Sequence, residues 1–93
     1  MLGVDIGTSS SKGVLVALDG RLLATAVREH DVDRPRTGHV EMDAEVWWAE
    51  RVGITRELLE PSVARVVAVG VSGMGPCVLV TDEAGAPLRP AIL

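Results

Sequence analysis

The chain has 93 residues, of which 13 are acidic and 9 basic, so its net charge is −4. This balance excludes a basic footprint for nucleic acid or for an anionic membrane, and we expect neither as a partner. With 47% hydrophobic and 24% charged residues the composition is that of a folded globular chain, which excludes general disorder. A chain of this length supports one small core, so residues 1–93 are expected to lie in one domain.

The sequence also indicates where the protein is expected to be located and whether the chain is expected to be part of a longer protein. The single cysteine, Cys77, excludes a disulfide framework and favours a reducing compartment, so the expected location is cytoplasmic. No stretch approaches the roughly 18 apolar residues that a membrane span needs, and no export signal is evident. The chain stops on the apolar run Pro90–Leu93, from which we expect it to be a piece of a longer protein.

Three strands are predicted in the first third of the chain. In Leu2–Ile6, aliphatic residues alternate with glycine and Asp5, which is the period of a strand with one aliphatic face. The runs Lys12–Leu18 and Arg21–Glu29 are also extended. Asp19-Gly20 between them favours a type I′ turn, so the two runs predict a β-hairpin.

A connector and a helix follow. Asp31–Met42 contains proline, glycine and five charged residues without a period, which predicts a loop or a partly extended connector. Residues 44–60 predict an amphipathic helix that Asp43 caps and Pro61 ends. Its predicted apolar face consists of Trp47, Trp48, Val52, Ile54, Leu58 and Leu59. Glu50 falls on the predicted polar face, and Arg51, inside the apolar arc, is expected to extend its charge to solvent.

The last third predicts further extended segments. Val63–Val71 is a β-branched run typical of a buried strand, and a glycine-rich loop follows it. Cys77–Thr81 predicts another strand, Asp82–Pro87 a turn, and Leu88–Leu93 an extended segment. The expected order is β-β-β-α-β-β, which indicates an α/β fold with a mixed sheet and a flanking helix.

The stretch Asp5–Gly13 carries the most chemistry. Glycines let a ligand approach the backbone, hydroxyl and N–H groups donate to phosphate oxygens, and the ammonium of Lys12 can neutralise charge. Asp5, a carboxylate expected to be buried in an aliphatic strand, could hold a hydrated Mg²⁺. The spacing excludes a Walker A loop and a dinucleotide fingerprint, whereas an ordinary hairpin with a serine-rich turn remains an alternative.

Five segments, in register over the whole chain, carry a family resemblance. They are Val4–Lys12 with the hairpin after it, Gly38–Asp43 running into Val46–Trp48, Val69–Met74, and Pro87–Leu93. In this order they resemble the amino-terminal part of the FGGY carbohydrate kinases, closest to xylulokinase-like members. The resemblance implies an incomplete actin-like, ribonuclease H-type ATPase domain, of which residues 1–93 supply the first part, while the rest of this domain and a C-terminal domain lie outside the chain.

The resemblance also implies the activity and the site residues. The expected activity is ATP-dependent phosphorylation of a sugar or polyol hydroxyl, with a pentulose such as xylulose as the expected acceptor. Asp5 would help to position Mg²⁺, and the nucleotide phosphates would face Gly7, Thr8, Ser9, Ser10 and Lys12. The sugar pocket would be lined by Met74, Gly75 and Pro76.

At Met74–Pro76, the expected wall of the sugar pocket, the sequence departs from patterns known in the family. Glycerol kinases carry an Arg-Glu pair and typical xylulokinases a Met-His pair, whereas Gly75-Pro76 offers no side-chain donor or acceptor. The family's general base, an aspartate, is expected beyond residue 93, so the isolated chain is expected to be inactive. A homodimer is one assembly that the full-length enzyme could form.

Two other functional classes remain as alternatives. A chaperone-type or acetate-kinase-like ATPase would share the turn but not the Trp-Trp helix or the Pro-Ala-Ile-Leu segment. The second alternative is an actin-like-fold nucleotide-binding module without sugar kinase activity. Among the remaining residues, Cys77 is expected to be a buried hydrophobe, Trp47 a core anchor, and His30 and His39 surface or hydrogen-bonding residues, not metal ligands.

Overall fold

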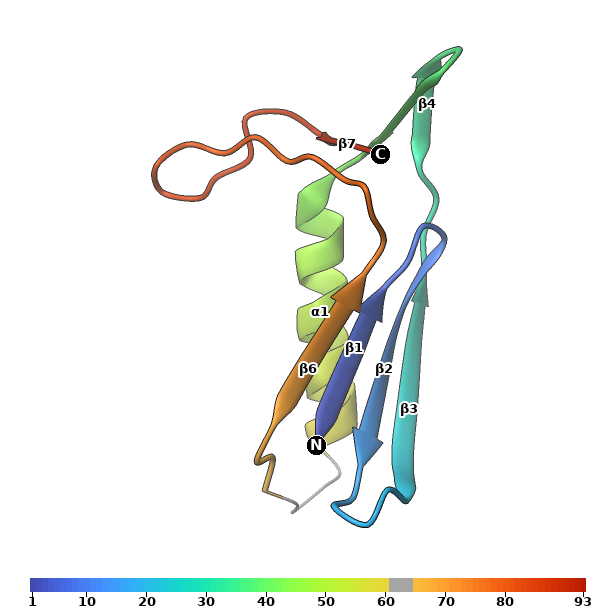
Figure 1. The fold of residues 1–93 in the computed structure, drawn as a ribbon, viewed down its shortest axis with the longest axis vertical. Coiled ribbons are helices and arrows are strands. Elements are labelled where there is room, and N and C mark those ends of the chain that lie inside the picture. The colour runs from blue at the N-terminus through green and yellow to red at the C-terminus, as the bar shows by residue number, and fades with distance from the viewer. Residues whose placement is uncertain (61–64) are drawn as a thin grey trace.

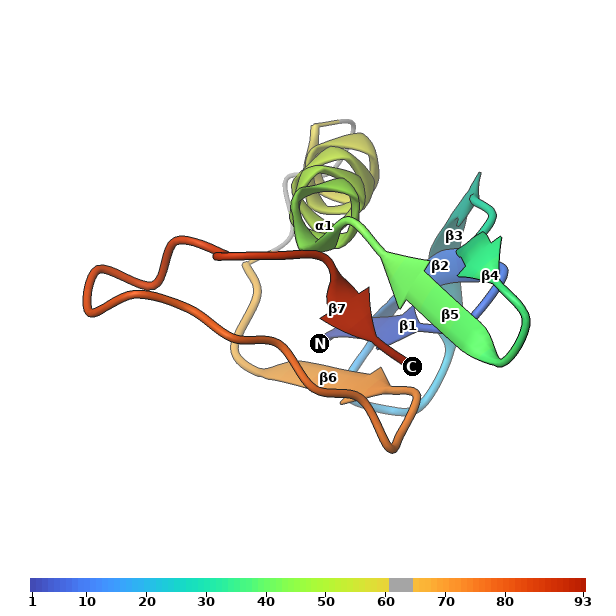
Figure 2. The same cartoon turned by 90° about the horizontal axis from the view of Figure 1, so that it is seen from above.

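The computed structural model describes residues 1–60 and 65–93. The strands are β1 (Leu2–Ile6), β2 (Ser10–Val16), β3 (Leu22–Glu29), β4 (Asp33–Arg36), β5 (His39–Met42), β6 (Val69–Gly73) and β7 (Ala91–Ile92). The helix is α1 (Ala44–Leu59). It lies along one face of a four-stranded sheet, and the segment after β6 extends beyond that sheet (Figures 1 and 2). Within the described ranges, no helix is long and apolar enough to cross a membrane.

The main sheet has the strand order β3-β2-β1-β6. β2 is antiparallel to both β1 and β3, whereas β6 runs parallel to β1, so the predicted mixed sheet is confirmed. The alternation in β1 also holds, because Leu2 and Val4 are buried while Asp5 is exposed.

The predicted hairpin is confirmed as β2 and β3, but its turn type and strand ends are wrong. Only Gly20 has a positive φ, of 88°, and a type I′ turn needs two such residues. The Gly20 N–H donates to the Ala17 carbonyl, and the Ala17 N–H donates to the Arg21 carbonyl. These hydrogen bonds form a tight turn that leaves the five residues 17–21 outside the strands, so β2 ends at Val16 and β3 begins at Leu22.

A second hairpin occupies the segment predicted as a connector. β4 and β5 are antiparallel and turn at Gly38, whose φ is 80°, and β7 adds to β5 to form a small three-stranded sheet. All four residues of β4 are exposed. A strand with solvent on both faces needs no alternation of apolar and polar residues, which is why the sequence showed no period here.

The core lies between α1 and the main sheet. Asp43 caps the helix as predicted, because its Oδ1 accepts from the Glu45 N–H at 2.9 Å. Ile54 and Leu58 are buried against the sheet over Gly13. They form one cluster with Leu2, Val4 and Ala26. The predicted end of the helix at Pro61 lies outside the described residues.

Two predictions for the last third are wrong. Val63–Val71 does not form a buried strand: its first two residues lie outside the described ranges, β6 begins only at Val69, and all five residues of β6 are exposed at the sheet edge. Cys77–Thr81 makes only isolated bridges, Val78 to Ile92 of β7 and Thr81 to Pro87, and so does not form a continuous strand. Without a strand to pack, Cys77 is exposed and not buried.

Candidate functional site

The predicted phosphate-binding turn connects β1 to β2. The Gly7 N–H donates to the Ser10 carbonyl at 2.8 Å, which closes a tight turn with Thr8 and Ser9 at its tip. Both tip residues are exposed, so their hydroxyl groups are open to a ligand. Glycine suits the first position because a Cβ on Gly7 would lie 3.0 Å from the Ser10 carbonyl oxygen.

A row of three polar residues crosses the sheet beside this turn. Asp5 of β1 lies opposite Lys12 of β2 and opposite Ser72 of β6. Asp5 and Lys12 are exposed on the face that α1 does not cover, and the Ser72 Oγ donates to Asp5 Oδ1 at 2.5 Å. The expectation of a buried Asp5 is therefore wrong, because its side of the sheet has no covering layer in the described chain. The row instead presents a carboxylate, a hydroxyl and an ammonium together.

The loop after β6 lies against the predicted phosphate-binding turn. The Met74 N–H donates to the Ile6 carbonyl at 3.0 Å, and the Thr8 Oγ1 lies 3.4 Å from the Met74 Sδ. β1 and β6 are parallel, so their carboxyl ends meet at one edge of the sheet (Figure 1). Two segments 66 residues apart in sequence are thus brought together. Gly75 and Pro76 continue this loop and are exposed.

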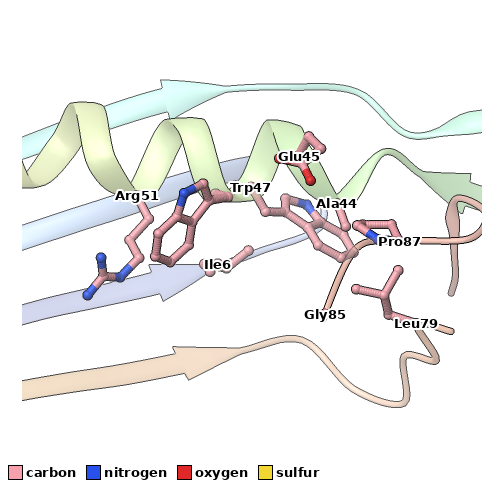
Figure 3. A pocket seen from close by; sticks show the side chains of 9 residues that line it. Ile6, Ala44, Glu45, Trp47, Arg51, Leu79, Gly85 and Pro87 are labelled. Atoms are coloured by element: carbon pink, nitrogen blue, oxygen red, sulfur yellow. The ribbon is translucent and has the colours of Figure 1, made fainter. Parts of the chain in front are cut away.

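One hollow adjoins this loop, and a second lies against the same face of α1. The smaller, of about 290 Å³, is lined by Ile6, Trp47, Val71, Ser72, Gly73, Met74 and Cys77. The larger, of about 440 Å³, lies between the first half of α1 and the segment around Leu79 and Pro87 (Figure 3). Trp47 lines both, so it is a half-buried wall and not the core anchor that we expected. Trp48 is 59% exposed, and the Arg51 guanidinium lies 5.1 Å from its ring centroid, so Arg51 stacks on an indole.

A buried polar network behind the turn was missed by the sequence analysis. His30 Nε2 lies 2.9 Å from the Gly7 carbonyl oxygen and His30 Nδ1 lies 2.9 Å from Glu50 Oε2. The fully buried Ser11 hydroxyl donates to the same carboxylate oxygen at 2.6 Å. The hydrogen-bonding role expected for His30 is confirmed, whereas placing Glu50 on the solvent face was wrong. The spacing along the helix could have predicted this position of Glu50. Glu50 precedes the core residue Ile54 by four positions, so the two side chains share one helix face.

The residues present fit a nucleotide with Mg²⁺. Mg²⁺ usually keeps several waters and takes one or two carboxylates together with phosphate oxygens. Asp5 supplies one such carboxylate on an open face, next to the donors of the turn. Among the described residues there is no group of three or more His, Cys, Asp or Glu side chains that could hold a metal without a ligand's help. Asp5 is therefore suited to a metal that arrives with phosphate.

Comparison with known proteins decides the family. The sequence model of the FGGY family of carbohydrate kinases, N-terminal domain, matches residues 1–93. The chain belongs to the FGGY family of carbohydrate kinases. The actin-like ATPase fold expected from the resemblance is thereby confirmed, with the mixed sheet and flanking helix described above.

Individual FGGY relatives agree with this assignment. The chain is 32% identical over 97 residues to a glycerol kinase of Rhodopirellula baltica and 31% identical over 96 residues to a xylulose kinase of Lactococcus lactis. The whole chain is covered in both matches, but only 18% and 19% of the relatives. The crystal structure of xylulose kinase from Rhodospirillum rubrum superposes with a TM-score of 0.92 at 36% identity, over 98% of this chain and 19% of that one. The chain thus spans about a fifth of the length of these FGGY kinases.

Proposed function

We propose that residues 1–93 are the first part of the N-terminal domain of a full-length kinase that transfers the γ-phosphoryl group of ATP to a hydroxyl of a sugar or polyol. The observation that carries this proposal is the contact between Thr8 and Met74. Through it, the turn suited to phosphate adjoins the loop suited to the acceptor. In-line transfer requires both substrates to be held side by side, and positioning supplies much of the rate enhancement.

Each polar residue of the turn has a role in this reaction. The hydroxyl groups of Thr8 and Ser9 and the backbone N–H groups of Gly7–Ser10 that remain unpaired donate to phosphate oxygens. The Lys12 ammonium neutralises phosphate charge from the neighbouring strand. Asp5, oriented by the Ser72 hydroxyl, would hold Mg²⁺, which when bound supplies further neutralisation of the phosphate charge.

The acceptor proposed is a pentulose such as xylulose. Met74, Gly75 and Pro76 form its wall in this chain, beside the hollow that Trp47 also lines. Because Gly75 and Pro76 have no polar side-chain atoms, acceptor hydroxyls would bond to backbone groups here or to residues outside the chain. The general base belongs to the remainder of the protein, so the isolated chain should not transfer phosphate. We place the full-length enzyme in the cytoplasm.

An acceptor panel tests this function in the full-length protein. ADP release would be followed with ketopentoses, aldopentoses, hexoses, glycerol and other polyols, and products would be identified by mass spectrometry. We expect turnover that depends on one acceptor class, with a phosphorylated product. ATP binding without turnover on any acceptor would contradict the kinase proposal and favour a nucleotide-binding module.

A further inference from the structure

His30 is the residue on which the buried network depends. Its side chain is 4% exposed and that of Glu50 is 11% exposed. His30 directly follows β3, whereas Glu50 lies in the middle of α1. The Ser11 hydroxyl bonds the same carboxylate oxygen from β2. Burying polar groups is costly unless they are hydrogen-bonded, and each side chain of this trio has a partner. The phosphate-transfer roles given above use none of the three.

Hydrogen-bond chemistry restricts the ring of His30. A backbone carbonyl can only accept, so Nε2 must carry the proton that bonds the Gly7 oxygen. Nδ1 faces a carboxylate oxygen, so one proton lies between Nδ1 and Glu50 Oε2. Rotating the ring would break both contacts at once. The imidazole is therefore locked in one orientation, with Nε2 directed at the turn.

His30 contacts the turn at two carbonyl groups, one on either side of Thr8. Its side chain bonds the Gly7 carbonyl, and its backbone N–H donates to the Ser9 carbonyl at 3.0 Å. In a trans peptide the C=O and N–H groups point in opposite directions. Holding the Gly7 carbonyl toward His30, which Glu50 anchors on the helix side, directs the Thr8 N–H away from α1. That is the side of the sheet on which Asp5 and Lys12 are exposed.

We propose that His30 is a positioning residue, which together with Glu50 and Ser11 fixes the peptide between Gly7 and Thr8 so that the Thr8 N–H faces the nucleotide phosphates. This proposal rests on the proposed function in one respect, namely that the phosphates bound at the turn are those of ATP. It couples α1 to the turn, because a shift of Glu50 would release the ring and then the peptide.

Variants of the full-length protein test this role. His30→Gln and His30→Ala remove the fixed ring, and Glu50→Gln weakens its anchor. The matched controls are His39→Gln, at an exposed histidine of β5, and Glu60→Gln, at the exposed end of α1. We expect the Kd for MgATP, measured by calorimetric titration, to rise about tenfold in His30→Gln and Glu50→Gln and further in His30→Ala, which is the scale of one or two lost hydrogen bonds. The KM of the acceptor and both controls should stay within about twofold of wild type.

A spectroscopic measurement keeps the proposal testable if a variant does not fold. In ¹⁵N-histidine-labelled wild-type protein, we expect His30 to show an Nε2-bound proton that exchanges slowly with water. We also expect its ring signals to shift on addition of MgATP, while those of His39 do not. An Nε2 without a proton, or ring signals that MgATP leaves unchanged, would overturn the proposal.

The outcomes separate this inference from the kinase proposal. Acceptor turnover by wild type, with an unchanged MgATP Kd in His30→Gln and Glu50→Gln, would overturn the positioning role and leave the kinase standing. A lowered Tm with equal losses toward ATP and acceptor would mean a purely structural role and would also overturn it. MgATP binding that His30→Gln weakens, in a protein that phosphorylates no acceptor, would support the positioning role while the kinase proposal fails.

Discussion

At the scale of single residues, charge is arranged asymmetrically around the turn. Asp5 and Lys12 face each other across β1 and β2 on the open side of the sheet, and Ser72 holds the carboxylate from the other side. In the proposed function, the ammonium would bind phosphate and the carboxylate would hold a cation. Lys12 is the only lysine in the chain, so no neighbouring lysine can take its place.

Replacing Lys12 tests that arrangement. Lys12→Met removes the charge but keeps a long apolar side chain, and we expect the KM for MgATP in the full-length kinase to rise about tenfold or more, because a charge-assisted bond to phosphate is lost. Lys12→Arg should recover part of the affinity. Steady-state kinetics with varied ATP measure the effect, and an unchanged KM in Lys12→Met would argue against a phosphate-facing lysine.

The sequence predicted the residues of the turn better than the network behind it. Asp5, Thr8 and Lys12 lie in one contiguous stretch with recognisable chemistry, and the structure keeps them together. Glu50 and His30 are 20 residues apart, and their contact depends on which face of α1 meets the sheet. The helix face was predicted from all apolar residues, including the exposed Trp48, which moved its centre away from Glu50.

At the scale of elements, α1 approaches the sheet closely at one glycine. A Cβ on Gly13 of β2 would lie 2.2 Å from Ile54 Cγ2 and 3.1 Å from Leu58 Cδ1. Glycine at this position therefore lets the two buried helix residues sit directly on the strand. The same strand follows the predicted phosphate-binding turn, so the packing of α1 also helps to fix where that turn lies.

Gly13→Ala should lower the free energy of unfolding by about 1–3 kcal/mol, because the added methyl group overpacks the core. The matched control is Gly70→Ala in β6, where a Cβ would meet nothing within 4 Å and φ is not positive. Urea unfolding of the full-length protein measures both. Equal stability of the two variants would contradict the close approach of α1 to β2.

Elements with a buried face were predicted more accurately than those without one. β1, β2, β3 and α1 each bury residues against the core. Alternation predicted β1, two extended runs around Asp19-Gly20 predicted β2 and β3, and the helical period predicted α1. The hairpin of β4 and β5 is largely exposed and is held by strand pairing, and the ion pair of Arg89 with Glu41 at 2.5 Å fastens the last segment to it. Pairing of exposed strands produces no periodic pattern of apolar residues in the local sequence, so these strands could not be predicted from it.

At the scale of the whole molecule, much apolar surface is open. Val67, Val69 and Val71 at the edge of the main sheet are each more than half exposed, and so is Val78 in the following segment. Soluble monomers rarely expose large contiguous apolar patches. In the family, this chain corresponds to about a fifth of each relative, so such surfaces are available for burial by further chain.

The isolated chain of 93 residues should therefore self-associate or unfold partially in solution. Size-exclusion chromatography with light scattering, together with thermal melting followed by circular dichroism, measures both properties. We expect a mass above the 9.8 kDa of the monomer, or a broad transition without cooperativity. A monodisperse monomer with a sharp melting transition would show that these apolar surfaces need no cover.

The most direct test of the phosphate-transfer account is ADP release by the full-length protein with its preferred acceptor, comparing wild type with Asp5→Asn. Asp19→Asn, in the hairpin turn between β2 and β3, is the matched control because it removes one carboxylate charge from an exposed aspartate remote from the site. We expect Asp5→Asn to lower kcat at least a hundredfold, roughly the scale of losing a charge that positions a metal on transferring phosphate, while Asp19→Asn stays near wild type. Undiminished turnover in Asp5→Asn would contradict the role of this turn in phosphoryl transfer.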